Sequence, residues 1–402
     1  MKIRSITYFC HPSRPLDTRV ILKAGRLLSK VKRIFEDNDY EVETTRVATV
    51  PFPMILEGRL DQTIQLAQDM EAAAREAGID YASLGPALPE FPASYDIIPE
   101  ALAATGNIFF SGMMTRGREI FPVAVRACAG IIQRTATILA DGFKNLFFCG
   151  LANVGPGSPF FPAAYWDQRA PAFAIATEAA DLAVEAFTGT AELAEGRRRL
   201  TTAIEKHARR ICSCARLLSC RFSGIDFSLA PFPEDSKSLG MAFERLGVQA
   251  VGLHGSLAAA AILTEAIETA QFPRCGFSGL FLPVFEDSVL ARRAAEGILS
   301  IKDLLLYSAV CGAGLDTLPL AGETSAEQIT ALLLDVCALA TRLDKHLTAR
   351  LMPIPGRKVG DPIQFNFAFF SGSRVIALDA LPLYNSHLSG NMPFHLSTLH
   401  GK

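Results

Sequence analysis

Residues 307–324 read Tyr-Ser-Ala-Val-Cys-Gly-Ala-Gly-Leu-Asp-Thr-Leu-Pro-Leu-Ala-Gly-Glu-Thr, which is typical of a helix end, a glycine-lined turn and a short apolar strand. Gly312 and Gly314 allow backbone angles and close chain approaches that a side chain would prevent. Asp316 lies inside the apolar strand, where an ionised carboxylate needs a partner. Cys311 lies at the turn. A carboxylate and a thiol at the mouth of a strand predict a site here, but they do not name its reaction.

Strand patterns and helix patterns alternate on both sides of this stretch. Apolar strands are expected at residues 3–10, 41–50, 79–84, 107–113, 145–151, 220–229, 275–283, 314–319, 347–353 and 374–381. The clearest helical patterns cover residues 17–38, 61–78, 257–270, 287–310 and 325–345. Strands that alternate with helices of this length predict an α/β fold with mainly parallel strands.

A long, mostly helical stretch at residues 163–218 separates the first five expected strands from the last five. We therefore expect a single α/β domain over residues 1–402, with a first half at 1–160, a helical connector at 161–218 and a second half at 219–402. The strand-borne carboxylates Asp80, Asp226, Asp316 and Asp379 follow similar residues. They are expected either to line one mouth of the fold or to cap the next turn or helix.

Composition limits the class of partner. Half of the residues are apolar, a fifth are charged and the net charge is −2, so nothing indicates binding to nucleic acid. The basic residues between 197 and 210 have the spacing of one solvated helix face. No apolar run reaches the ~18 residues of a membrane span. Nine cysteines without a framework and an N-terminus unlike a signal peptide predict reduced thiols and a cytoplasmic protein. The apolar composition also favours a homo-oligomer.

Several sequence blocks carry a family resemblance. They are Met-Lys-Ile-Arg-Ser-Ile-Thr at 1–7, Asn-Val-Gly-Pro-Gly-Ser-Pro-Phe-Phe-Pro-Ala-Ala-Tyr at 153–165, Gly-Phe-Ser-Gly-Leu-Phe-Leu-Pro-Val-Phe-Glu-Asp at 276–287, residues 307–320, and Arg-Leu-Met-Pro-Ile-Pro-Gly at 350–356. Together they resemble the family catalogued as domain of unknown function 711, also called uncharacterised protein family 0210, over nearly the whole chain. That family is similar in fold to the pyruvate formate-lyase-like glycyl radical enzymes. The resemblance implies a ten-stranded α/β barrel of two five-stranded halves, with helices outside.

Radical chemistry is not expected to follow from this resemblance. Glycyl radical enzymes resemble one another in an Arg-Val-x-Gly-Tyr/Phe segment near the C-terminus, whose glycine stores the radical. The nearest match is Arg-Val-Ile-Ala-Leu at 374–378, with Ala377 in place of the glycine. Because fold likeness does not transfer chemistry, we expect no glycyl radical in this chain.

The glycine-rich loop at 153–165 follows an apolar strand. Asn153 is a candidate hydrogen-bonding group for a ligand, and the backbone amides of Gly155 and Gly157 are candidates for an anion cradle. The loop matches neither a phosphate-binding nor a dinucleotide-binding motif. Its alternative role is a folded connector that buries its aromatic residues.

Glu286 and Asp287 follow the strand expected at 275–283. Two carboxylates at a strand exit can hold a divalent metal ion or divide the roles of acid and base. The alternative for Asp287 is the N-cap of the next helix, a position that Asp favours. Glu286 is therefore the stronger catalytic candidate.

His254 and Ser256 precede an alanine-rich helix, with Ser256 expected as its N-cap. A histidine beside glycine can act as base or metal ligand, although a lone histidine is more often hydrogen-bonded locally. Cys311 needs a base within reach to act as a nucleophile. Arg350 can bind a carboxylate or phosphate through its planar fork, or it can pair with an acidic neighbour.

These residues support three hypotheses. The first is a cytoplasmic enzyme that acts on a small polar or anionic metabolite in a barrel. Its catalytic candidates are Glu286, Asp316, His254 and Cys311, and its substrate-binding candidates are Asn153, Gly155, Gly157, Ser256, Gly312, Gly314 and Arg350. The second is a non-catalytic ligand-sensing or assembly module whose interior is filled by phenylalanines. The third is a metal-dependent hydrolase.

Overall fold

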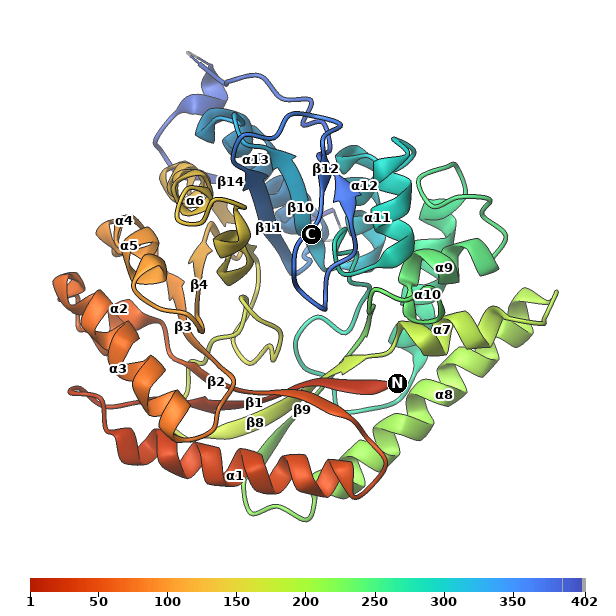
Figure 1. Ribbon diagram of the computed structural model, residues 1–402, viewed down its shortest axis with the longest axis horizontal. Helices are drawn as coiled ribbons and strands as arrows, with labels where there is room; N and C mark the ends of the chain where they lie inside the picture. The colour runs from red at the N-terminus through yellow and green to blue at the C-terminus, as the bar shows by residue number, and fades with distance from the viewer. Residues whose placement is uncertain (385, 400–402) are drawn as a thin grey trace.

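A nine-stranded sheet forms the centre of the protein in a computed structural model, which describes residues 1–384 and 386–399 (Figure 1). The strand order is β10-β11-β7-β4-β3-β2-β1-β8-β9. The strands are β1 (Lys2–Cys10), β2 (Val42–Thr49), β3 (Tyr81–Ala87), β4 (Ile108–Met113), β7 (Phe148–Ala152), β8 (Ala172–Glu178), β9 (Arg221–Ala230), β10 (Gly314–Ala321) and β11 (Leu347–Ile354). Nearly all of their residues are buried, as expected for strands covered on both faces.

The sheet consists of two parallel groups of strands that run in opposite directions. β1, β2, β3, β4 and β7 pair in parallel with one another. β8 pairs in parallel with β9, and β10 with β11. The groups meet at two antiparallel seams, β1 with β8 and β7 with β11. The carboxyl ends of the two groups therefore point to opposite ends of the sheet.

Helices lie around the outside of the curved sheet (Figure 1). The longer helices are α1 (Thr18–Glu36), α3 (Thr63–Glu76), α6 (Pro122–Ala136), α7 (Ala180–Phe187), α8 (Leu193–Ala215), α9 (Leu239–Arg245), α10 (Ser256–Thr269), α11 (Ser288–Ala295), α12 (Ile301–Cys311) and α13 (Ala326–Leu343). The short helices are α2 (Phe52–Ile55), α4 (Ala93–Asp96) and α5 (Ile98–Ala103), with the single-turn helices η1 (Leu60–Gln62), η2 (Phe143–Phe147), η3 (Asp235–Lys237) and η4 (His387–Ser389). The minor strands are β5 (Thr115–Arg116), β6 (Glu119–Ile120), β12 (Pro362–Ile363), β13 (Ser373–Arg374) and β14 (Phe394–His395).

Side-chain caps fix where several helices begin. Asp17 accepts a hydrogen bond from the Arg19 amide at the start of α1. Ser300 and Ser325 begin α12 and α13 with reciprocal hydrogen bonds to Asp303 and Gln328 three residues on. These contacts satisfy backbone amides that have no partner inside the helix, so each cap fixes the residue at which its helix begins.

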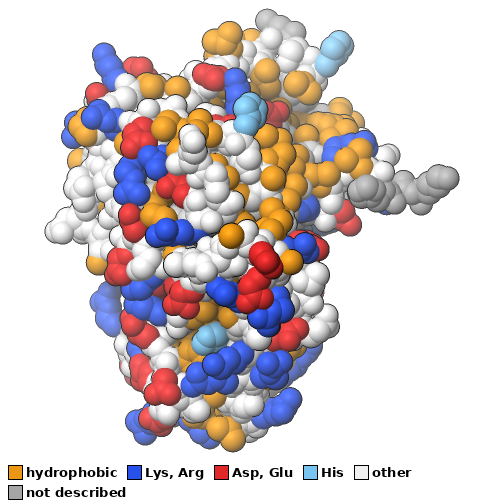
Figure 2. Space-filling model, turned by 90° about the vertical axis from the view of Figure 1, so that its right-hand side faces the viewer, with side chains coloured by type: hydrophobic (Ala, Val, Ile, Leu, Met, Phe, Trp, Pro, Cys, Tyr) orange, Lys and Arg blue, Asp and Glu red, His pale blue; other side chains and the backbone are white. Residues whose placement is uncertain are grey.

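The basic stretch at 197–210 is a solvated helix face, as its spacing predicts. Arg198 and Arg199 both pair with Glu195 on α8, and Arg197 pairs with Glu265 on α10. Basic and acidic side chains are interspersed over the lower part of the face in Figure 2. Their mixture leaves no patch of a single sign over that part of the face.

Residues 273–284, between α10 and α11, join the two ends of the sheet through isolated backbone contacts. Ile225 and Leu229 of β9 form parallel bridges to Arg274 and Leu280. Pro283 bridges Asp316 of β10, and the Val284 amide donates to the Asp316 carbonyl at 3.2 Å. The segment is not a regular strand, because Ser278 and Gly276 have positive φ angles that interrupt the ladder.

The continuous sheet has nine strands, so the α/β class is confirmed and the ten-stranded barrel stays a prediction. The strand expected at 275–283 is replaced by isolated bridges, and the one expected at 374–381 is limited to β13. In contrast, β8 lies inside the stretch expected to be mostly helical, because its alanine-rich sequence, Ala-Phe-Ala-Ile-Ala-Thr-Glu, carries a weak strand signal. The helix expected at 287–310 is two helices, separated at Gly297, whose φ is 75°.

None of the helices in residues 1–384 and 386–399 is both long and apolar enough to cross a membrane. All nine cysteines have free thiols.

Candidate functional site

A cavity lies inside the curve of the sheet. Its lining includes Arg4 of β1, Arg46 of β2, Asp316 of β10 and Arg350 of β11, together with Ala230 at the end of β9. Because β9 and β10 are at opposite ends of the strand order, the sheet curves around this space. The volume of the cavity that is open to the centre of a water-sized molecule is about 80 Å³.

A network of buried ion pairs crosses the cavity. Arg4 pairs with Glu178 at 3.1 Å, with Glu43 at 3.4 Å, and with Glu286. Arg350 donates to the Glu286 carboxylate at 2.8 Å and to Asp316. Glu286 thus bridges two arginines that come from the two parallel groups of strands.

The backbone of β10 is irregular where it carries Asp316. The pairing with β11 shifts register between Leu315 and Leu318, and Thr317 has a φ of 42°. A left-handed conformation is uncommon for a β-branched residue, and such strain is concentrated at functional sites. The bulge lets β10 place the Asp316 carboxylate beside Arg350.

Charge balance within the network determines the protonation of its members. Burial raises the pKa of Asp316, an effect that Arg350 opposes. Burial disfavours the charged form of Arg350, but the Asp316 and Glu286 carboxylates outweigh it and raise the pKa of Arg350. The arginine therefore stays charged, whereas burial makes Asp316 easier to protonate.

Glu178 and Glu43 form a second ionisable group beside Arg4. Burial, followed by the hydrogen bond to Glu43, raises the pKa of Glu178 to about 9. The Oε1 atom of Glu43 is buried and has no other donor within the described residues. A carboxylic acid proton on Glu178 would provide that donor.

Arg46 differs from the other two cavity arginines because it forms no ion pair with any carboxylate in the described part of the chain. Within residues 1–384 and 386–399 its hydrogen-bond partner is Thr44 Oγ1, which accepts from Nε at 2.8 Å. Its guanidinium carbon lies 5.0 Å from the Phe161 ring centroid and 5.8 Å from that of Tyr81. Burial and the neighbouring Arg4 lower the pKa of Arg46 to about 10.

The structure brings Glu286, Asp316 and Arg350 together in the cavity, and it places Cys311, Gly312 and Gly314 elsewhere, before and at the amino end of β10. Burial raises the pKa of the Cys311 thiol to about 11, which opposes a role as nucleophile. A Cβ on Gly314 would lie 2.2 Å from the Thr348 carbonyl oxygen, so this glycine permits the close approach of β10 and β11.

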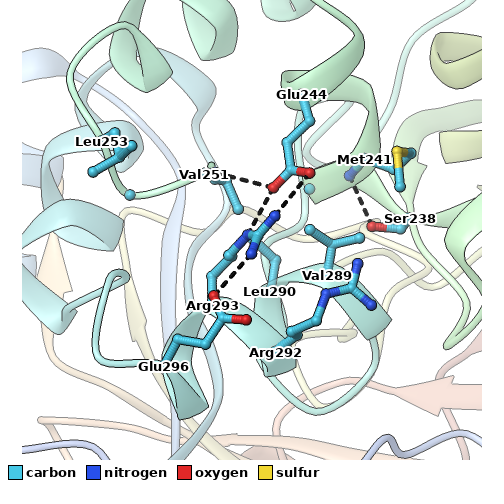
Figure 3. Close-up of polar contacts among 12 residues, drawn as sticks. Ser238, Met241, Glu244, Val251, Leu253, Val289, Leu290, Arg292, Arg293 and Glu296 are labelled. Atoms are coloured by element: carbon cyan, nitrogen blue, oxygen red, sulfur yellow. Dashed lines mark hydrogen bonds and ion pairs between the residues drawn. The ribbon is translucent and has the colours of Figure 1, made fainter. Parts of the chain in front are cut away.

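His254 and Ser256 lie on the outside of the sheet and do not line the cavity. Ser256 Oγ donates to the Leu253 carbonyl and accepts from the Gly252 amide, while Gly255 is the N-cap of α10. The neighbouring Val251 is held by Glu244, which also binds Arg293 through both carboxylate oxygens (Figure 3).

Asn153 and Gly155 line a second, open cleft at the carboxyl ends of β1, β2, β3, β4 and β7. The Asn153 side chain is already engaged: it accepts from Thr115 Oγ1 at 2.9 Å and donates to the Ala340 carbonyl at 3.0 Å. The Gly157 amide donates to the Tyr165 carbonyl. These contacts match those of a folded connector.

Asp287 is an N-cap, as its sequence position predicts. Its Oδ1 accepts from the Val289 and Leu290 amides of α11, and its Oδ2 accepts from the Leu239 and Gly240 amides of α9. Asp287 therefore faces away from Glu286 and the two do not share a ligand. Among the described residues no group of three or more His, Cys, Asp or Glu side chains is placed to hold a metal ion.

The other strand-borne aspartates also have structural partners. Asp80 accepts from the Thr45 amide, and Asp226 accepts from the Phe277 and Ser278 amides. Asp379 pairs with Lys302 at the surface. Of this set only Asp316 lines the cavity.

Sequence reasoning missed Arg4, Glu43, Arg46 and Glu178. The first three lie in strands that were predicted correctly, and a charged residue inside a buried strand is the signal that could have identified them. Glu178 was missed because β8 was not predicted.

A curved α/β sheet around a buried, charged cavity defines the class of this protein. The family described as "Uncharacterised ACR (DUF711)" matches residues 1–368, so the chain belongs to that family. A UPF0210 protein of Desulforudis audaxviator is 31% identical over 378 residues, which cover 86% of this chain and 82% of that protein. Another, of Methanococcoides burtonii, is 30% identical over 347 residues, 81% of this chain and 76% of that protein. Neither name states an activity.

Proposed function

We propose that the protein is an enzyme that binds a small anionic metabolite in the central cavity, with Arg46 as the anion-binding group. The observation that carries this proposal is the missing counter-charge: Arg4 and Arg350 each contact carboxylates, whereas Arg46 contacts none among the described residues. Arg46 is 9% exposed as a residue, and it lines the cavity. A buried cation without a partner is costly unless a ligand supplies the opposite charge.

Acid–base chemistry is the reaction class that the neighbouring groups support. Burial and the hydrogen bond to Glu43 raise the pKa of Glu178, and Glu43 lines the cavity. Glu286 and Asp316 present further carboxylates to the same space. A carboxyl group that stays protonated at neutral pH can donate to a substrate, and a neighbouring ionised carboxylate can accept. In this proposal Arg46 fixes the anion, and the Glu43–Glu178 pair gives or takes the proton.

The proposed enclosure is a closed ten-stranded barrel, with residues 273–284 as the tenth strand between β9 and β10. The bridges at Leu280 and Pro283 support it, as does the division into two oppositely directed parallel groups. The first half would then be residues 1–160, and the second half, at 219–402, would take β8 from the connector at 161–218 as its fifth strand, because β8 pairs in parallel with β9. Ala377 is exposed and does not line the cavity, which supports chemistry without a glycyl radical.

A second candidate function is ligand sensing without catalysis. Glu286 and Asp316 are held by Arg350, so their carboxylates are not free in the absence of a ligand. This alternative keeps the same anion site. It differs in predicting that the bound metabolite is released unchanged.

The first prediction concerns Arg46→Met. We expect acetate and inorganic phosphate to raise the thermal unfolding temperature of the wild-type protein and to lose this effect in the variant, because the guanidinium is the anion's partner. Since the lone buried charge is removed, the free energy of unfolding of the ligand-free variant should be unchanged or higher by up to ~3 kcal/mol.

Arg116→Met is the matched control. Arg116 lies in the second cleft and pairs with Glu90 at the surface, so its removal should leave the anion response intact. An Arg46→Met protein that folds and still responds to both anions as the wild type does would overturn the proposal.

A further inference from the structure

The cavity has a polar side and an aromatic side. Its ionised groups are grouped around Arg4 and Arg350. The lining beside Arg46 includes Glu43 and Thr44 and, on its other side, the rings of Tyr81, Phe109 and Phe161. A ligand held by Arg46 therefore has charged groups on one side and aromatic carbon on the other.

The rings around Arg46 form one cluster. The Phe109 ring packs edge-on against Tyr81, with centroids 5.3 Å apart and an interplanar angle of 86°. It also packs against Phe161 at 5.2 Å and 68°. Tyr81 and Phe161 are the same two rings that lie beside the Arg46 guanidinium. The cluster therefore fixes both the anion-binding group and an apolar surface next to it.

A second aromatic wall completes the enclosure. Phe160 and Phe281 are stacked, with ring centroids 4.4 Å apart and an interplanar angle of 28°, and both line the cavity. Phe367 and Phe369, from the loop between β12 and β13, line it as well. Sugar hydroxyls placed against these carbon surfaces would lose hydrogen bonds to water without gaining others.

The size of the cavity limits the ligand further. One water molecule needs ~10–15 Å³ of the volume that is open to the centres of water-sized molecules. The cavity's 80 Å³ therefore corresponds to roughly six water molecules. That is room for a single small ring with its carboxylate, and too little for a nucleotide.

Building on the anion site proposed above, we infer that the ligand is a small aromatic carboxylate: a planar ring that lies against the Phe109 cluster, with its carboxylate on Arg46. A flat ring can pack against these aromatic faces and edges, whereas a puckered saturated ring of the same carbon count cannot approach them as closely. The carboxylate matches the planar guanidinium fork.

The test is calorimetric titration of the full-length protein with four probes: benzoate, cyclohexanecarboxylate, acetate and inorganic phosphate. We expect benzoate to bind at least tenfold more tightly than each of the others. Arg46→Met should abolish binding of all four. Phe109→Leu, which keeps an apolar side chain but removes the ring, should weaken benzoate about five- to tenfold and leave acetate within twofold of the wild-type value.

Phe161→Leu serves as the second ring variant if Phe109→Leu fails to fold, as judged by circular dichroism. Equal affinities for benzoate and acetate or phosphate, all dependent on Arg46, would overturn the aromatic ligand and leave the anion site standing. Equal affinities for benzoate and cyclohexanecarboxylate would overturn the planar ring. Binding of none of the probes, or binding that Arg46→Met leaves intact, would remove the anion site itself and this inference with it.

Discussion

At the scale of single residues, the three cavity arginines differ in how their burial is compensated. Arg4 contacts three carboxylates and Arg350 two, and these neighbours raise the pKa of both groups against the opposing effect of burial. In the described part of the chain Arg46 contacts only Thr44 and aromatic rings, and burial lowers its pKa. Arginine thus forms structural ion pairs at two positions and lacks a counter-charge at the third. This difference could not be predicted from the residue type or from its position in the sequence.

Glu178 provides a prediction about pH. Burial raises its pKa from an ordinary value of 4.5 to about 9, so the folded state binds this proton more tightly than the unfolded state. The stabilisation is complete below pH 4.5 and is lost as pH rises toward 9. Glu178→Gln keeps an amide that can donate to Glu43. Between pH 4.5 and 9 the free energy of unfolding of this variant should fall less steeply with pH than that of the wild type, by up to ~1.4 kcal/mol per pH unit.

Urea unfolding of wild type and Glu178→Gln at several pH values between 5 and 9 measures this effect. Glu195→Gln is the control: Glu195 is on the exposed face of α8, and its side-chain hydrogen bonds with Arg198 and Arg199 lower its pKa to about 2, outside the interval. Identical pH slopes for wild type and Glu178→Gln would mean that Glu178 is ionised throughout.

At the scale of secondary-structure elements, Asp287 joins two helices. One carboxylate accepts amide hydrogens from the first turns of both α9 and α11, and Ser238 donates to it as well. Asp287→Ala leaves four buried amides without an acceptor and should lower the free energy of unfolding by ~2–4 kcal/mol. Asp287→Asn retains two lone pairs and should lower it less. Urea unfolding measures both, and a loss below 0.5 kcal/mol (roughly the smallest effect of one cap) for Asp287→Ala would contradict the double cap.

Most elements could be predicted from the sequence, because strands buried on both faces are apolar runs and helices carry caps. The elements that were missed or misplaced have compositions that are compatible with more than one secondary structure. The alanines of β8 are compatible with a helix, and residues 287–310 read as one helix until Gly297 adopts its positive φ. The segment at 275–283 has strand composition, but its positive φ angles result from contacts with Asp226 that are remote in sequence.

At the scale of the whole molecule, the site depends on contacts that a linear sequence cannot give. Glu286, Asp316 and Arg350 were predicted as site residues, and the structure brings them together. Their partner Arg4 is 282 residues from Glu286, and it reaches the cavity because the first strand pairs antiparallel with β8. The structure places His254, Cys311 and Asn153 at the ends of elements that do not line the cavity. Residue spacing alone could not distinguish those ends from the positions that do line it.

The Arg350 network tests whether the two groups of strands are coupled through the cavity. Arg350→Met leaves the Asp316 and Glu286 carboxylates buried with one fewer cation, so it should lower the free energy of unfolding at pH 8 by about 3–5 kcal/mol. Because burial raises the pKa of Asp316 and Arg350 no longer opposes it in the variant, Asp316 can be protonated, and the loss should shrink as pH falls. The triple variant Arg350→Met, Asp316→Asn, Glu286→Gln removes the uncompensated charges and should regain most of the stability.

Coupled residues give non-additive effects, so the coupling within the network is measured by comparing two losses of unfolding free energy: that of the triple variant and the sum for the three single variants. Additive losses, or a deficit for Arg350→Met that does not depend on pH, would show that Arg350 stabilises the protein by packing and that charge does not link the two groups of strands.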